Sequence, residues 1–190
     1  MIFLKFIVVL VHLFLRVPLS FVMNAYYFLR IGFRKYKEYK QELDELIAKE
    51  LHDTNSLNDA CSFVCRHFGK YLADPVRGLI DWTSNPVIQY ARRHEGLLTH
   101  SNDCDDFSSA LKYVLKQTAN FDKVYSAVSV SKIPFVIASH SYVFAKNDGD
   151  YYVFSPYRYL GISPDKCGIV DYINQAYDGL YEYFDFYVIT

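Results

Sequence analysis

The stretch HSYVFAKNDGDYYVFS, residues 140–155, has the pattern of a β-hairpin. Apolar and aromatic residues alternate on both sides of Asp148-Gly149, a pair that strongly favours a tight turn between antiparallel strands. The register centred on this turn predicts three opposed pairs: Lys146 with Tyr151, Phe144 with Val153 and Tyr142 with Ser155. His140 and Ser155 then share one face of the hairpin as diagonal neighbours, roughly 7 Å apart between their Cβ atoms.

The hairpin lies in a region of sheet-forming composition, because β-branched and aromatic residues dominate from Val124 onward. The pattern predicts strands over 124–130, 140–146, 151–155, 157–162 and 184–190, with a short helix over 171–180. The preceding segments are helical in pattern, with predicted helices over 34–52, 57–72 and 87–93 and within 101–119. Helices followed by an antiparallel sheet predict an α+β fold.

Composition narrows the class of protein. The chain has 190 residues, with 20 Lys and Arg against 21 Asp and Glu, so it has no overall charge that would attract nucleic acid, and we expect no such partner. A hydrophobic content of 52% excludes a disordered chain. Four cysteines in this length do not make a disulfide scaffold.

Residues 1–31, MIFLKFIVVLVHLFLRVPLSFVMNAYYFLRI, are nearly all apolar and are long enough to span a membrane. Arg16 falls near the centre, however, at a cost of about 2.5–3.5 kcal/mol for insertion. At helical spacing the basic residues form one stripe, consisting of Lys5, His12, Arg16, Arg30, Arg34 and Lys37. Such a stripe favours a helix that lies in the membrane interface, or one whose basic edge faces a partner.

We therefore expect residues 1–31 to form a membrane-associating helix or signal-anchor, which would place the protein at a membrane. A cleaved signal peptide and a helix packed on the protein itself remain alternatives. Residues 32–56 are interpreted as a polar helix or connector, and residues 57–190 as the main domain. Basic residues after the apolar segment favour a cytoplasmic position for the C-terminal part of the chain, which conflicts with an exported enzyme and leaves the side of the membrane open.

Cys104 lies at the start of the helix predicted within residues 101–119, SNDCDDFSSALKYVLKQTA. Ser101 or Asn102 can act as the N-cap, which places Cys104 in the first turn. The face turned toward the protein then comprises Cys104, Phe107, Ser108 and Leu111. Backbone N–H groups and the positive end of the helix dipole favour a thiolate at this position, and a backbone N–H there can help to form an oxyanion hole.

Three carboxylates beside Cys104 oppose a thiolate unless they point away, cap the helix or bind a cation. They are Asp103, Asp105 and Asp106, whose hard oxygens would suit Ca²⁺. A buried cysteine beside a helix cap is the simplest interpretation of this motif alone. Cys61 and Cys65, four residues apart and followed by His67, are a weak metal motif because no second pair of ligands accompanies them.

Taken together, these elements resemble the transglutaminase-like cysteine peptidases, the bacterial branch of the papain-like superfamily, which has phage members. The family has a Gly-Asp-Cys-Asp/Glu-Asp-Phe-Ala-like helix start, a later His opening a strand, and an Asp that ends the next strand before Pro. Here the corresponding segments are NDCDDFS at 102–108, HSYV at 140–143 and VFSP at 153–156. The spacing of DPVRGLIDWTSNP at 74–86 is similar to the lead-in of such proteins, and the resemblance covers roughly residues 57–162.

The resemblance implies a papain-like fold, with the catalytic Cys at a helix start packed on an antiparallel sheet. It implies that Cys104 attacks an amide carbonyl of a protein or peptide substrate to form a thioester, with His140 as general base and Ser155 holding the imidazole ring. A second oxyanion donor would come from the upstream loop, where Asn85 and Gln89 are candidates. His100 is a rival base, and no cofactor or metal is implied.

Two positions depart from the family pattern. Asn102 stands in place of Gly, and Asn is the best substitute for Gly if the backbone at this position is left-handed. Ser155 stands in place of the triad Asp and supplies no negative charge to the histidine. The alternative is therefore a catalytically degenerate domain that acts as a membrane-associated binding or structural module, with the aromatic segments 151–162 and 172–187 as its interface. Whether water or an amine would resolve the thioester also stays open.

Overall fold

The computed structural model describes residues 14–15, 17–52, 57–69, 83–97, 103–118, 121–131, 139–155, 158–163 and 183–189. At 127–131, 139–140, 158, 163 and 183–189 this description is of the backbone alone. The helix predicted over 171–180 and residues 1–13 lie outside these ranges.

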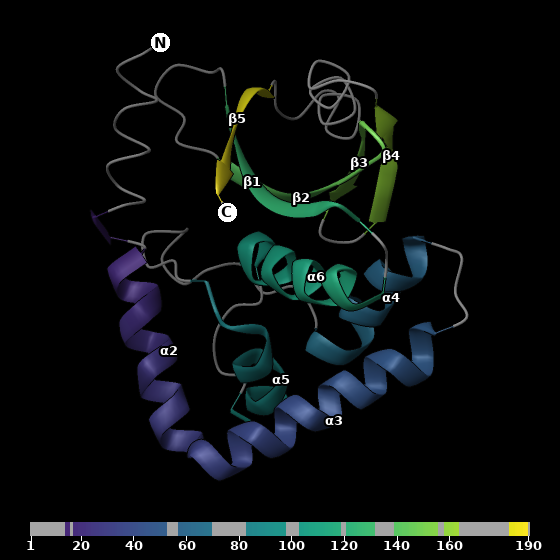
Figure 1. Ribbon diagram of the computed structural model, residues 1–190. Helices are drawn as coiled ribbons and strands as arrows, with labels where there is room; N and C mark the ends of the chain where they lie inside the picture. Colours follow the sequence, from purple (N-terminus) through teal and green to yellow (C-terminus); the bar gives the residue numbers. More distant parts are fainter. Residues whose placement is uncertain are drawn as a thin grey trace.

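Within the described ranges, helices come first and strands come after them. The helices are α2 (Val17–Ile31), α3 (Phe33–Leu51), α4 (Leu57–Phe68), α5 (Pro86–His94) and α6 (Cys104–Thr118). The strands are β1 (Lys123–Ser131), β2 (Ser139–Asn147), β3 (Asp150–Ser155), β4 (Arg158–Ser163) and β5 (Tyr183–Ile189). All neighbouring strands are antiparallel, in the order β4-β3-β2-β1-β5, and the curved sheet lies above the helices in Figure 1. The predicted α+β class is confirmed.

The β2–β3 hairpin has the register that the sequence predicts. Lys146 pairs with Tyr151 and Phe144 with Val153, and the ladder ends at Val143–Phe154, one pair short of Tyr142 and Ser155. Asp148 and Gly149 both have positive φ, at 50° and 93°. Two successive residues of positive φ make the turn whose twist matches that of the flanking strands, which is why an Asp-Gly pair suits this position.

The sheet presents one face to α6. Val124, Val143, Ala145 and Phe154 share a buried core with the apolar stripe of α6, which consists of Phe107, Ala110, Leu111, Val114 and Leu115. Because alternate residues of a strand belong to opposite faces, Tyr142 and Phe144 lie on the other face of β2, where they are also buried. Position 140 is two residues before Tyr142 in the same strand, so it lies on the same face of β2 as Tyr142 and Phe144.

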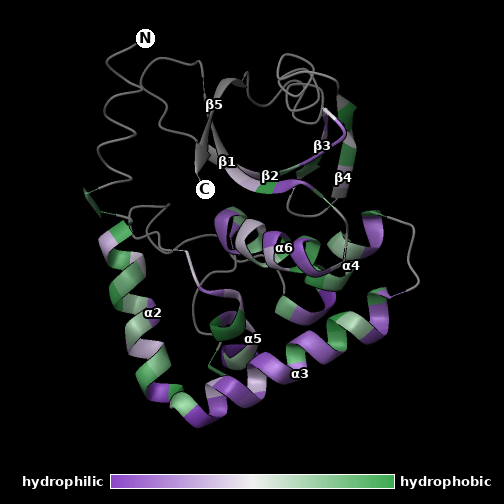
Figure 2. Cartoon of the chain, viewed as in Figure 1, coloured by the Kyte–Doolittle hydropathy of each residue, from purple (hydrophilic) through white to green (hydrophobic). Residues whose placement is uncertain are grey.

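α3 belongs to the main core although most of its residues are polar. Its apolar positions recur every four residues, at Leu43, Ile47 and Leu51, so they form one stripe along the helix. This stripe is packed in the same cluster as Phe63 of α4 and Leu111 of α6. In Figure 2, α3 is mainly hydrophilic in colour, whereas α2 is mainly hydrophobic. The helix predicted over 34–52 is therefore part of the core, and its role goes beyond that of a connector.

Local sequence features determine where α4 ends and where α5 begins. α4 ends at Phe68, earlier than the predicted residue 72, because Gly69 adopts a φ of 109° that leaves the helical conformation. α5 begins at Pro86, where proline suits the first helical position, and the side chain of Asn85 accepts hydrogen bonds from Val87 N and Ile88 N as its N-cap.

α2 and α3 are separate helices joined at Gly32, whose φ is 84°. The predicted stripe of basic residues assumed one continuous helix, so the break at Gly32 removes Arg34 and Lys37 from the stripe that includes Arg30. Lys5, His12 and Arg16, the other members of that stripe, lie outside the described residues. Among the helices that the structure describes, none combines the length and the apolar character needed to cross a membrane.

Candidate functional site

The start of α6 is built by Asp103. Its carboxylate Oδ1 accepts hydrogen bonds from the backbone N–H groups of Asp105 and Asp106, at 3.2 and 3.3 Å. Its carbonyl oxygen accepts the first helical bond, from Phe107 N at 3.1 Å. Asp103 is therefore the N-cap, in place of the predicted Ser101 or Asn102, because its side chain reaches two amides that the first turn leaves without helical partners.

Cys104 is the first residue of α6, as the sequence predicts. Its side chain is half-buried, while Phe107, Ser108 and Leu111 on the same helix face are buried. The thiol sulfur and one carboxylate oxygen each of Asp103 and Asp105 lie within 4.8 Å of one another. The helix dipole favours a thiolate at this place, and the two carboxylates disfavour it, so opposing fields act on the thiol.

Asp105 and Asp106 bind the segment that precedes α5. Thr83 Oγ1 donates a hydrogen bond to Asp105 Oδ2, and Ser84 N donates one of 2.6 Å to Asp106 Oδ1. Asp106 is fully buried, and desolvation raises its pKa well above the usual value, with the negative charge of Asp105 adding to the effect. The hydrogen bond from Ser84 and the positive charge of Arg92 act in the opposite direction.

The two predicted candidates for a second oxyanion donor have structural roles. Gln89 Nε2 donates to the carbonyl oxygens of Ser84 and Asp106, at 2.9 and 3.0 Å, and so joins α5 to the first turn of α6. Asn85 caps α5, and its backbone N–H donates to Asn24 Oδ1. These bonds tie the α6 start to α5 and to the segment before it, which the sequence did not indicate because the partners come from distant segments.

The predicted histidine lies on a neighbouring strand at the same end of the fold. His140 is the second residue of β2 and pairs with Ser129 near the end of β1. α6 ends at Thr118 and β1 begins at Lys123, so this short link makes α6 and β1 run in opposite directions where they pack together. The start of α6 therefore lies toward the end of β1 and the beginning of β2.

Ser155 is the last residue of β3 and is buried, with 5% of its surface exposed. It lies at the end of the ladder nearest the start of β2. The side chain of His140 and the whole of His100 and Asn102 lie outside the described part of the chain. Sequence reasoning thus identified the strands that carry the proposed catalytic residues, and these strands converge on the end of the sheet beside the α6 start.

The metal interpretations find little chemical support in the described residues. Asp103, Cys104 and Asp105 offer two hard oxygens and one soft sulfur, while Ca²⁺ prefers six or more oxygens. At the other motif, burial raises the pKa of Cys61 to about 12 and also raises the pKa of Cys65, which disfavours the thiolate form that binds a metal ion. The nearby His67 ring contacts Glu50 of α3, at 3.1 Å between Nε2 and Oε2.

Comparison with known proteins adds no relative. No protein-family model matches the chain, and neither a curated protein nor a solved structure matches it significantly. The resemblance to transglutaminase-like peptidases therefore rests on the sequence motifs of this chain.

Proposed function

We propose that the protein is a membrane-associated thiol hydrolase of papain-like fold that cleaves a peptide or side-chain amide. The observation that carries this proposal is the position of Cys104, which begins a helix whose first turn is hydrogen-bonded to the segment before α5, at the end of the fold where β2 begins. A half-buried thiol at a helix start is accessible to a substrate and lies in the positive field of the helix end.

The reaction would proceed in two steps. The Cys104 sulfur attacks the amide carbonyl carbon, and His140 takes the thiol proton and passes it to the leaving amine. The resulting thioester is then hydrolysed by water, which His140 deprotonates, and the proton returns to Cys104. A backbone N–H at the α6 start stabilises the oxyanion in both steps.

A second candidate function is a degenerate domain that binds a partner without catalysis. Two observations favour it. Position 140 lies on the same face of β2 as Tyr142 and Phe144, which is opposite to the face that packs on α6, the helix that begins with Cys104. Ser155 also supplies no charge to an imidazolium.

The discriminating experiment measures the rate at which a thiol-reactive affinity probe labels Cys104, identified by peptide mass spectrometry. In the hydrolase, His140→Ala should slow labelling near neutral pH by about a hundredfold or more, because the general base is lost. His67→Ala is the matched control, since that ring contacts Glu50 on another part of the surface, and it should leave the rate unchanged. Equal rates for wild type and His140→Ala would favour the binding module.

A further inference from the structure

The outer side of α2 and the turn before it carry an unusual concentration of exposed apolar side chains. Phe21 is 76% exposed and Leu29 is 78% exposed. The remaining large apolar side chains on this side are also exposed, and we call the set the α2 outer face: Phe14, Leu15, Val17, Phe21, Val22, Tyr26 and Leu29. Contiguous apolar exposure of this kind marks an interaction site on a soluble protein.

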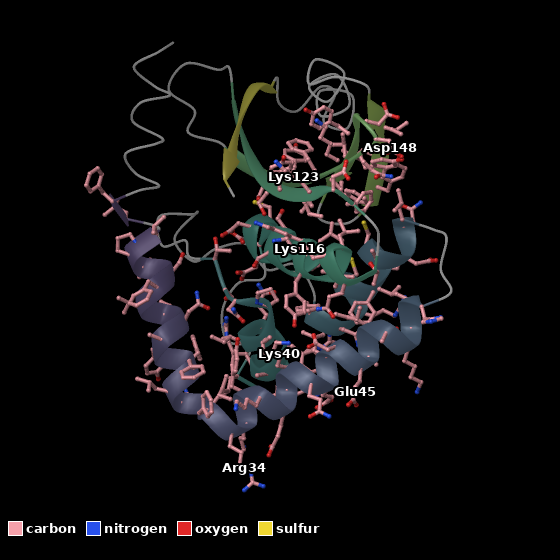
Figure 3. The ribbon with its side chains drawn as sticks, viewed as in Figure 1. Arg34, Lys40, Glu45, Lys116, Lys123 and Asp148 are labelled. Carbon is pink, nitrogen blue, oxygen red and sulfur yellow. The ribbon has the colours of Figure 1, made fainter. Side chains whose placement is uncertain are left out.

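The orientation of this face is fixed by the opposite side of the helix. Tyr27 and Ile31 are buried against Ile88 and Ala91 of α5. The side-chain amide of Asn24 donates to the carbonyl oxygen of Thr83, at 2.9 Å, so α2 is also tied to the segment before α5. Figure 3 shows aromatic side chains projecting from α2 away from the rest of the molecule.

The charged residues in this part of the sequence are all basic. The first 37 residues contain six Lys and Arg and no Asp or Glu, so all 21 acidic residues of the chain come after them. Arg30 lies at the edge of the outer face, with its Nη1 3.5 Å from the hydroxyl of Tyr26. At the start of α3, the exposed ring of Phe33 has the ammonium group of Lys37 4.5 Å from its centre. Arg34, whose side chain is 93% exposed and whose Nε lies 3.0 Å from Glu38 Oε1, is at the corner between the two helices in Figure 3.

We propose that the α2 outer face docks in the plane of an anionic lipid bilayer, with the apolar side chains among the acyl chains and the basic residues at the headgroups. Apolar anchors beside Lys and Arg are the chemistry of interfacial helices. A second copy of this chain suits the face less well, because a symmetric contact would bring like charges together. The described helix α2 by itself is too short to span, since its 15 residues extend only about 22 Å and the hydrocarbon core is about 30 Å thick.

Binding of the α2 outer face to the bilayer would fix the orientation of the α6 start relative to the membrane surface. Thr83 is hydrogen-bonded to both helices. Its backbone N–H donates to Ser20 Oγ of α2, its carbonyl oxygen accepts from Asn24 Nδ2 of α2, and its hydroxyl donates to Asp105 Oδ2 in the first turn of α6. This docking specifies the membrane association of the proposed function and does not depend on the chemistry of Cys104, so vesicle binding and Cys104 labelling can fail separately.

Binding of the full-length protein to vesicles of phosphatidylcholine, with and without phosphatidylglycerol, tests the proposal. The double variant Phe21→Glu with Leu29→Glu should weaken binding to anionic vesicles by about tenfold or more, because two apolar side chains leave the acyl region. Ile162→Glu, at an exposed apolar position on β4, is the control and should bind as wild type does. Replacement of Arg30, Arg34 and Lys37 by Gln should remove the preference for phosphatidylglycerol.

The depth of the helix distinguishes docking in the plane from spanning. In a Trp82→Phe background, Phe21→Trp and Leu29→Trp should be quenched alike by lipids brominated near the headgroup, because a helix parallel to the surface holds both positions at one depth. In a helix along the membrane normal, these positions would differ by about 12 Å. Ile162→Trp should remain unquenched.

Three results would overturn the proposal. Unchanged vesicle binding by the double Glu variant would place the membrane contact elsewhere in the chain. Different bromine depths for positions 21 and 29 would indicate a spanning helix. The third result would be a wild-type protein that is a dimer without lipid and a double Glu variant that is a monomer but still binds vesicles. The α2 outer face would then be the contact with a second copy of the chain.

Discussion

The backbone N–H of Ser84 donates a 2.6 Å hydrogen bond to the carboxylate Oδ1 of Asp106, and both residues are buried. This bond joins the residue before the α5 cap to the first turn of α6. Asp106 Oδ2 has no hydrogen-bond partner among the described residues, and desolvation together with the charge of Asp105 raises the pKa of Asp106 well above its usual value. The carboxyl group is thus held in a place that favours its neutral form.

Asp106→Asn should stabilise the protein at pH 8. A raised pKa in the folded state means that the contribution of Asp106 to stability is complete below its unfolded pKa of about 3.9 and decreases as the pH rises toward the folded pKa. Asparagine keeps the Oδ1 acceptor for Ser84 and carries no charge. The stability of the variant should therefore not decrease with rising pH through this group. Thermal unfolding between pH 4 and pH 8 measures the difference, with the exposed Asp122→Asn as control. A lower melting temperature than wild type at pH 8 would show that Asp106 is needed as a carboxylate.

Two substitutions separate the helix-capping role of Asp103 from the effect of its negative charge on Cys104. Asp103→Ala removes the acceptor for two first-turn amides and should lower the free energy of unfolding by about 0.5–2 kcal/mol, whereas Asp103→Asn retains the cap and should cost far less. Asp103→Asn also removes a negative charge close to the Cys104 sulfur, so iodoacetamide should alkylate Cys104 faster at neutral pH. Denaturant titration and peptide mass spectrometry measure the two effects. Slower alkylation would mean that the carboxylate assists the thiol.

The position of α3 in the core predicts a contrast between two leucines. Leu43→Ala should lower the free energy of unfolding by about 2–5 kcal/mol, because Leu43 is completely buried and truncation leaves a cavity. Leu29→Ala on the α2 outer face should change it by less than about 0.5 kcal/mol, because that side chain is 78% exposed. Urea unfolding followed by circular dichroism provides both values. Similar losses in the two variants would contradict the packing described for α3.

Ser155 offers a test of the orienting role in the proposed hydrolase. Ser155→Asp should raise the rate of Cys104 alkylation near neutral pH, because a carboxylate near His140 stabilises the thiolate–imidazolium pair. Ser155→Ala should lower the rate only modestly, since a neutral hydrogen bond contributes about 0.5–1.5 kcal/mol. The measurement is iodoacetamide labelling of Cys104 against pH in the three proteins. Identical profiles would show that Ser155 does not hold the ring of His140, and the degenerate binding module would then be preferred.

The sequence by itself determined the elements whose signals are local. Asp148-Gly149 and the alternation around it predicted the register of β2 and β3, because the turn conformation and the strand period depend only on residues a few positions apart. The placement of Cys104 in the first turn of α6 was predictable for the same reason, from the periodicity of the apolar residues that come after it.

Only the tertiary structure decided what the polar residues at the α6 start do. Asp105 and Asp106 could have capped the helix, repelled the thiol or held a cation, and they bind Thr83 and Ser84 because that segment, 22 residues earlier in the chain, packs beside them. The same holds for α2. Phe21 and Tyr27 are both aromatic residues of one helix, yet Phe21 is 76% exposed and Tyr27 is 6% exposed, because α5 covers one side of α2 and leaves the other uncovered.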